Sequence, residues 1–146
     1  MQEVLEQLPY QNPFLFVDQL TRLDEEGAEG SYTLKEDEFF YQGHFPGNPV
    51  TPGVILTEIA AQIGLVSLGI YLLRSSQDGE VIPVFSSSQM DFLKPVYPGE
   101  TVQVKSTKEY FRFSKLKCKV VMLNEAGEEV CKGTLSGMVT KKADKN

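Results

Sequence analysis

The pattern of apolar and polar residues changes twice along the chain, from strand-like to helical and back to strand-like. Before Pro9, the first eight residues predict one or two amphipathic helical turns. Residues 14–23 are rich in β-forming side chains, and residues 24–27 predict a turn that joins them to a second such run at 30–35. The beginning of the chain therefore predicts a short helix followed by a β-hairpin.

The strongest helical signal lies in the middle of the chain. Apolar residues recur there at steps of three and four positions, which places them along one face of a helix: Ile55, Ile59, Ile63, Val66 and Ile70. Small residues on the other faces allow close packing around much of the circumference. We predict a helix over residues 52–73, with Thr51 as its N-cap and Pro52 in its first turn.

Strand-like patterns fill the rest of the chain after a turn predicted at 75–79. They predict five strands, at residues 81–85, 90–93, 101–113, 115–123 and 129–140, with a hairpin turn at 124–127. The order of a hairpin, one long helix and a run of antiparallel strands predicts an α+β domain. In such a domain, a curved antiparallel sheet wraps around the apolar helix and encloses it.

Composition limits the classes of protein to which the chain can belong. With 146 residues, 41% of them hydrophobic and 23% charged, it is typical of a globular domain that needs no disulfide or metal to hold its core. We find no repeat, low-complexity tract or linker, and expect a single domain over residues 1–146 with a charged tail at about 141–146. The net charge of −6 provides no overall positive field, so we expect no nucleic-acid partner.

The chain carries no pattern typical of export. Its most apolar run, residues 63–73, is interrupted by Ser67 and is shorter than the roughly 20 residues that a membrane span needs. Its N-terminus lacks the positive start and apolar run of a signal peptide, so we expect a cytoplasmic protein without membrane insertion. Cys118 and Cys131 lie in strand-like segments without Cys or His at short spacing, and we expect buried free thiols and no metal.

One histidine is present, His44, in a loop crowded with glycine and proline at residues 42–47. A lone histidine beside aromatic residues is usually structural, with its ring nitrogens bonded to backbone groups. The glycines and prolines favour a functional role, because a plain connection does not need such a constrained backbone. Both interpretations stay open on this pattern alone.

Glu58 interrupts the apolar helix. Burying an unpaired carboxylate costs several kcal/mol, so Glu58 is expected to be paired, protonated or placed at a wet cleft. Gln62 lies one helical turn further on, within reach of the Glu58 side chain. The free N–H groups at the helix start, around Gly53, suit a carbonyl oxygen that gains negative charge. An imidazole base, a carboxyl acid and such donors together indicate proton abstraction next to a carbonyl.

Three segments carry a more specific signature, at residues 8–18, 40–62 and 90–100. The most specific part is the sequence Gly-His-Phe-Pro-Gly at 43–47, followed by Pro-Gly-Val at 52–54 and the carboxylate of Glu58. These segments resemble the bacterial (3R)-hydroxyacyl-[acyl-carrier-protein] dehydratases of type II fatty acid synthesis. The resemblance covers nearly the whole chain and implies the hot-dog fold, in which an antiparallel sheet wraps a long helix.

The resemblance also implies a role for individual residues. His44 would be the general base, and Glu58 the group that protonates or holds the departing β-hydroxyl. The Gly53 N–H would polarise the thioester carbonyl, and Gln62 would orient Glu58. The substrate tunnel would be lined by Phe45, Thr57 and Phe92. The reaction implied is loss of water from a (3R)-hydroxyacyl thioester to give the trans-2-enoyl thioester, in fatty acid or specialised lipid biosynthesis such as polyene formation.

Family members work as dimers that share each active site, combining the histidine of one chain with the carboxylate of the other. The resemblance therefore implies a homodimer, and it leaves open a homohexamer built as a trimer of dimers. It further implies a substrate carried on the phosphopantetheine of acyl carrier protein, with neither a metal nor a redox cofactor. Docking of that acidic carrier needs a positively charged rim around the site. The candidate residues for this rim are Lys94, Lys105, Lys108, Arg112, Lys115, Lys117 and Lys119. The alternative interpretation is that these residues only form the solvated face of the strands.

The chain departs from the family pattern in places. Tyr10 stands where the family commonly has His, Lys94 where it commonly has Arg, and Thr57 where it usually has an aliphatic residue. These differences concern the substrate rather than the chemistry. Relatives that also isomerise carry Asp in place of Glu58, which favours dehydration alone. A hot-dog acyl thioesterase and a non-catalytic acyl-binding subunit are the alternative functions.

Overall fold

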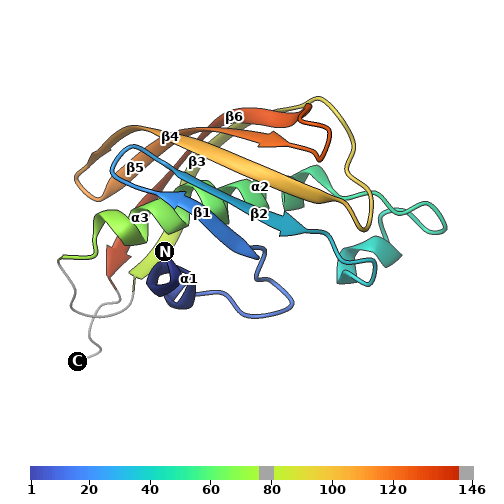
Figure 1. Ribbon diagram of the computed structural model, residues 1–146, viewed down its shortest axis with the longest axis horizontal. Helices are drawn as coiled ribbons and strands as arrows, with labels where there is room; N and C mark the ends of the chain where they lie inside the picture. The colour runs from blue at the N-terminus through green and yellow to red at the C-terminus, as the bar shows by residue number, and fades with distance from the viewer. Residues whose placement is uncertain (76–80, 142–146) are drawn as a thin grey trace.

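Residues 1–75 and 81–141 are described by the structure, a computed structural model. In chain order the elements are α1 (Gln2–Gln7), β1 (Gln19–Leu23), β2 (Ala28–Thr33), the 3-10 turn η1 (Phe39–Gln42), α2 (Gly53–Ala61), the π-helical turn η2 (Gln62–Val66), α3 (Ser67–Leu72), β3 (Val81–Phe92), β4 (Thr101–Arg112), β5 (Lys115–Leu123) and β6 (Glu129–Lys141). Figure 1 shows the strands curving around the central helical segment.

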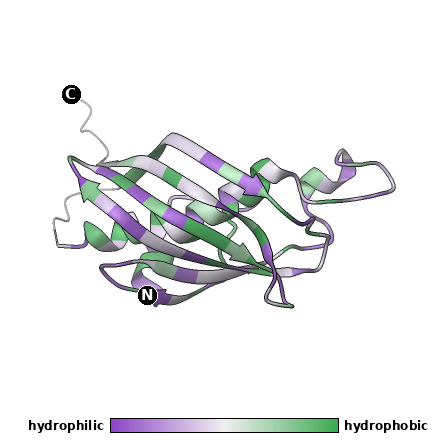
Figure 2. Ribbon diagram, turned by 90° about the horizontal axis from the view of Figure 1, so that it is seen from above, coloured by the Kyte–Doolittle hydropathy of each residue, from purple (hydrophilic) through white to green (hydrophobic). Residues whose placement is uncertain are grey.

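The sheet has six strands in the order β1-β2-β4-β5-β6-β3, and every neighbouring pair within the described residues is antiparallel. Buried and partly exposed residues alternate along β2, as expected when one face of a sheet packs on a core. Figure 2 shows hydrophobic and hydrophilic positions following one another along the strands. The α+β arrangement predicted from the order of the elements is confirmed.

The segments α2, η2 and α3 form one continuous helix from Gly53 to Leu72, one residue shorter at each end than predicted. The prediction that Thr51 caps it is wrong, because Pro52 is the N-cap and no side chain caps the helix. The Thr51 hydroxyl is hydrogen-bonded to the Tyr41 hydroxyl at 2.6 Å, and the Thr51 N–H donates to the Val96 carbonyl at 2.9 Å. Thr51 therefore holds the preceding loop in place instead of the helix start.

The central helix is 20 residues long with a mean hydropathy of 1.8, which by length and composition is enough for a membrane span. The apolar run found in the sequence at 63–73 is therefore shorter than the apolar helix in the structure. In the fold, 78% of its most apolar 18-residue window is buried, and Ile59, Ile63 and Leu68 have no exposed surface. Enclosure by the sheet explains why this helix is apolar around its circumference.

Some of the predicted strands have different bounds in the structure. The strands predicted at 81–85 and 90–93 form one strand, β3, which ends at Phe92, pairs with β6 and has a bulge between Phe85 and Ser87. The bulge accommodates the polar residues between the two apolar runs without ending the strand. The first hairpin strand was predicted from residue 14 but begins only at Gln19, because backbone groups of Phe14 and Phe16 bind the side chain of Gln62.

Cys118 and Cys131 are buried free thiols, as predicted. Burial raises the pKa of each thiol to about 12, so both stay protonated at neutral pH. The predicted turn at 75–79 and the predicted tail at 141–146 lie, apart from residues 75 and 141, outside the described residues.

Candidate active site

The side-chain amide of Gln62 joins the central helix to the segment before β1. Its Oε1 accepts a hydrogen bond from the Phe16 N–H at 2.8 Å, and its Nε2 donates to the Phe14 carbonyl at 3.0 Å. The same Nε2 donates to Oε2 of Glu58, one helical turn earlier, at 3.0 Å. Gln62 is fully buried, and these bonds use both of its N–H donors, so its position is fixed.

Glu58 is half-buried on the face of the helix that carries this amide. Burial raises the pKa of its carboxyl above the ordinary value of 4.5, although the hydrogen bond from Gln62 opposes the shift. Loss of water around the group disfavours the charged form, and one hydrogen bond to a neutral amide compensates only in part. A carboxyl with a raised pKa at a cavity can act as a general acid.

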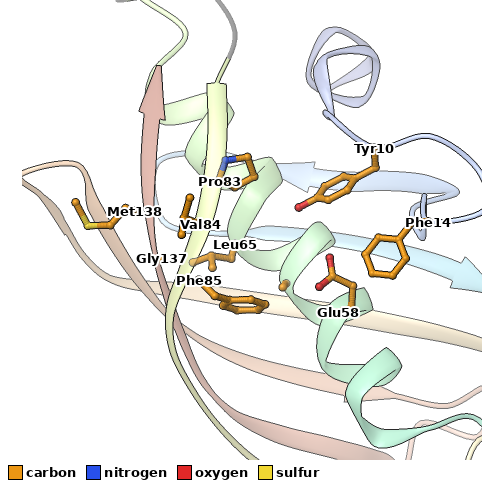
Figure 3. A pocket seen from close by; sticks show the side chains of 10 residues that line it. Tyr10, Phe14, Glu58, Leu65, Pro83, Val84, Phe85, Gly137 and Met138 are labelled. Atoms are coloured by element: carbon orange, nitrogen blue, oxygen red, sulfur yellow. The ribbon is translucent and has the colours of Figure 1, made fainter. Parts of the chain in front are cut away.

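A cavity of about 240 Å³ lies beside Glu58, between the central helix, the N-terminal segment and β3 (Figure 3). The lining residues are Tyr10, Phe14, Glu58, Ala61, Leu65, Pro83, Val84, Phe85, Gly137 and Met138. Of these side chains, only those of Tyr10 and Glu58 carry an oxygen atom. The rest of the wall is apolar and offers contact for a hydrocarbon chain.

His44 lies in the loop between η1 and α2, at the end of the molecule where the central helix begins (Figure 1). Its Nδ1 is 2.9 Å from the Val50 carbonyl oxygen, so Nδ1 carries the proton and donates it. Its Nε2 has no hydrogen-bond partner within residues 1–75 and 81–141 and keeps its lone pair. The Phe45 ring stacks on the imidazole with centroids 4.1 Å apart. An imidazole fixed in this way can act as a general base.

Gly53 begins the central helix, so its N–H is one of the first-turn donors that no helical carbonyl accepts. A Cβ added to Gly53 would lie 3.2 Å from the Phe92 ring, which shows how closely that ring covers the helix start. Thr57, one turn further on, donates its hydroxyl proton to the Gly53 carbonyl at 3.1 Å. A second cavity of about 290 Å³ opens here, lined by Thr51, Gly53, Leu56, Phe92, Leu93, Lys94 and Pro95.

The predicted site residues therefore fall into separate groups in one chain. Glu58 and Gln62 are hydrogen-bonded at the first cavity, and Gly53 and Phe92 meet at the second. His44 is not among the described residues that line either cavity. A single chain thus places His44 away from the cavity that Glu58 lines.

Tyr10 stood out in the sequence only as a departure from the family pattern, whereas the structure places its ring at the cavity of Glu58. The Tyr10 ring packs against that of Phe14, with centroids 6.5 Å apart. Phe14, which contributes both its ring and its carbonyl to the site, was not predicted at all. The only available signal was that both residues lie within the 8–18 segment, since no spacing rule connects that segment to Glu58.

The candidate residues for a basic rim have different surroundings, and Lys94 lies at the second cavity. Lys94 forms a salt bridge with Glu128 at 3.4 Å, and Lys117 pairs with Glu109 at 3.7 Å. Lys105 and Lys119 instead line a groove across the sheet that also contains acidic residues. In the part of the chain that the structure describes, no group of three or more His, Cys, Asp or Glu is arranged to hold a metal ion.

Known protein families provide an independent comparison. The model of the FabA-like domain matches residues 8–134. The chain belongs to the FabA-like domain family. It is 36% identical over 135 residues to the 3-hydroxyacyl-[acyl-carrier-protein] dehydratase FabZ of Caldicellulosiruptor bescii, with 91% of this chain and 93% of that one covered. The FabZ of Bacillus licheniformis is 35% identical over 135 residues, with 92% and 91% covered. The resemblance inferred from the motifs is confirmed.

Several solved structures have a fold similar to that of this chain. The dehydratase heterocomplex ApeI:P from Xenorhabdus doucetiae matches with a TM-score of 0.79 at 11% identity, over 94% of this chain and 91% of that chain. A hypothetical thioesterase with coenzyme A from Streptococcus pneumoniae matches with a TM-score of 0.62 at 16% identity, over 86% and 88% of the two chains. Likeness at such low identity shows the fold alone. Together with the family match, it confirms the predicted hot-dog fold.

Proposed function

We propose that the chain is a (3R)-3-hydroxyacyl-[acyl-carrier-protein] dehydratase, a hydro-lyase that removes water from its substrate to form the trans-2-enoyl thioester. One observation carries this proposal: Glu58, its pKa raised by burial, is held by Gln62 at an apolar cavity. The FabZ relatives, which are named 3-hydroxyacyl-[acyl-carrier-protein] dehydratases, support it over most of the chain. The pathway served would be fatty acid biosynthesis or a specialised route such as polyene formation, in the cytoplasm.

The proposed reaction uses His44 as the base and Glu58 as the acid. Because the Nδ1–H of His44 is bonded to the Val50 carbonyl, Nε2 is free to remove the proton from the carbon next to the thioester carbonyl. The electron pair of that C–H bond forms the new double bond, and the C–O bond breaks with its pair on oxygen. Glu58 gives this oxygen a proton, and water leaves. Proton transfers alone balance the reaction, so no oxidant or reductant takes part.

The helix start would stabilise the charge that develops on the thioester oxygen. The Gly53 N–H lies at the positive end of the central helix and has no helical acceptor. Phe92 covers Gly53, and with Phe45 and Thr57 it would border the path of the acyl thioester. Lys94 lines the same cavity and would meet the phosphate of the phosphopantetheine arm that acyl carrier protein presents.

Two copies of the chain would complete the site. His44 is absent from the described lining of the Glu58 cavity, and β3 is an edge strand of the sheet. Along β3, Val84 is 54% exposed and Phe85 44% exposed. Pairing of β3 with the β3 of a second copy would cover these side chains and extend the sheet across both chains. The proposed homodimer combines His44 of one protomer with Glu58 of the other, and a homohexamer of such dimers stays a prediction.

The direct test follows hydration of trans-2-enoyl pantetheine and carrier-bound thioesters, measuring loss of the conjugated absorbance and, separately, free thiol. We expect absorbance loss without thiol release. His44→Ala and Glu58→Gln should each lower kcat by about 10²- to 10⁴-fold, because each removes one proton transfer from the transition state. Tyr71→Phe, at the far end of the central helix, is the control and should keep the wild-type rate.

Other outcomes would contradict the proposal in distinguishable ways. Thiol release would indicate the thioesterase. Binding of the thioesters without either signal would indicate an acyl-binding subunit. Full activity of both His44→Ala and Glu58→Gln would remove these residues from the mechanism.

A further inference from the structure

Tyr10 and Glu58 stand opposite each other in a cavity that is otherwise apolar. Figure 3 shows the Tyr10 hydroxyl and the Glu58 carboxyl directed into the same space, from the N-terminal segment and the central helix respectively. The surrounding wall consists of apolar side chains from the helix, β3 and β6. Among the described residues that line the cavity, these are the two polar side chains that a ligand oxygen would meet.

The Tyr10 hydroxyl is available to a ligand. Within the described residues, no group forms a hydrogen bond with it, and no fully buried side-chain oxygen or nitrogen lacks a partner, so the hydroxyl is not sealed inside the protein. Burial and the nearby Glu58 charge both raise the pKa of Tyr10. The phenol therefore stays protonated at neutral pH, and it can donate a hydrogen bond.

Gln62 connects the segment that carries Tyr10 to Glu58 on the central helix. Its amide binds the Phe14 carbonyl and the Phe16 N–H in the segment that carries Tyr10, and also the Glu58 carboxyl on the helix. The Tyr10 ring is supported in turn by the Phe14 ring. The Glu58 carboxyl and the segment that carries Tyr10 are thus joined through one amide.

We propose that Tyr10 is a further catalytic residue, whose hydroxyl donates a hydrogen bond to the β-oxygen of the substrate while Glu58 transfers a proton to that oxygen. This inference rests on the proposed dehydratase function. Tyr10 neither gains nor loses a proton; it stabilises the charge that gathers on the oxygen as the C–O bond breaks. A neutral donor is effective here, because little water reaches the apolar cavity to compete with it.

The test compares Tyr10→Phe, which removes one oxygen and keeps the ring, with Tyr71→Phe, which removes the same atom from a half-buried tyrosine of α3. We expect Tyr10→Phe to lower kcat for hydration of trans-2-enoyl pantetheine about tenfold, the usual effect of losing one substrate hydrogen bond. Tyr71→Phe should keep the wild-type kcat. Tyr10→His restores an N–H donor and should recover part of the loss.

A binding measurement separates contact with the substrate from a structural effect. It uses the His44→Ala protein, whose turnover is expected to be about 10²- to 10⁴-fold slower than that of the wild type, with and without Tyr10→Phe. We expect Kd for (3R)-3-hydroxyacyl pantetheine to rise about three- to tenfold on Tyr10→Phe, while Kd for the saturated acyl pantetheine of the same length stays unchanged. The saturated ligand is the control because it lacks the β-oxygen.

The possible failures are distinct. Equal weakening of both ligands, or a wild-type kcat in Tyr10→Phe, would overturn the role of Tyr10 and leave the dehydratase intact. A wild-type protein that binds these thioesters but hydrates no enoyl thioester would overturn the proposed function itself. Binding of neither ligand would overturn both.

Discussion

A single carboxyl at Glu58 is expected to serve catalysis and to reduce stability. The helix around it is apolar and buried, and one amide from Gln62 is its only hydrogen-bond partner among the described residues. Burial raises the pKa of Glu58, so the native state binds a proton there more tightly than the unfolded chain does. Ionisation of this group is therefore less favourable in the folded protein than in the unfolded one.

We predict that Glu58→Gln stabilises the protein at neutral pH but not at acid pH. The wild-type stability linked to Glu58 is fully present below its ordinary pKa of 4.5 and is lost as the pH rises through its raised folded-state pKa. The neutral amide of Gln does not titrate and can still accept the bond from Gln62. The free energy of unfolding should be measured for both proteins by denaturant titration across this pH range. A difference in unfolding free energy between Glu58→Gln and the wild type that stays the same at every pH would contradict the prediction.

At the scale of elements, the central helix is shaped by its approach to the sheet. Its π-helical turn, η2, includes Gly64, whose carbonyl accepts a hydrogen bond from the Ser106 hydroxyl of β4 at 2.8 Å. A Cβ at Gly64 would lie 2.9 Å from that of Ser106 and 3.2 Å from Val120. The widened turn and the missing side chain together let the helix backbone lie directly against the strands.

Gly64→Ala should lower the free energy of unfolding by about 1–3 kcal/mol, because the methyl group would overfill this contact. The sign of this change tests the close contact. Alanine is the better helix former by about 1 kcal/mol, so the same substitution at a helix position with open space around it would stabilise the protein. Gly43→Ala is the control, because a Cβ there meets nothing within 4 Å. Denaturant unfolding of the two variants checks the prediction, and an equal or increased stability of Gly64→Ala would contradict it.

At the scale of the whole molecule, one chain leaves an edge strand with exposed apolar residues, and His44 is not among the described residues that line the Glu58 cavity. The exposed residues Val84 and Phe85 lie on β3, the strand that also borders the Glu58 cavity. In the proposed homodimer, a second chain would cover these residues and bring its own His44 to the cavity. Assembly and catalysis are therefore expected to depend on the same surface.

Complementation tests this dependence. A heterodimer of one His44→Ala chain and one Glu58→Gln chain should contain one working site, made from the intact His44 and Glu58 of different chains. Co-expression with two affinity tags and purification through both should therefore restore about half of the wild-type kcat per dimer, since one of two sites is complete.

The reverse pairing provides the control. A wild-type chain combined with a chain carrying both substitutions should have no complete site if the two residues come from different chains. Half activity in this heterodimer, with none in the first, would place His44 and Glu58 of each site within one chain. Each purified dimer is to be confirmed by its mass in solution.

The sequence by itself determined the features that depend on neighbouring residues. The helix followed from the spacing of Ile55 and its successors, and the bond between Gln62 and Glu58 followed from their separation of one helical turn. The tertiary structure alone decided which distant groups meet. Gln62 binds backbone groups 46 and 48 residues away, and Tyr10 faces Glu58, because the sheet folds the N-terminal segment against the central helix. No local pattern specifies such contacts, since they depend on how the whole sheet curves and closes around the helix.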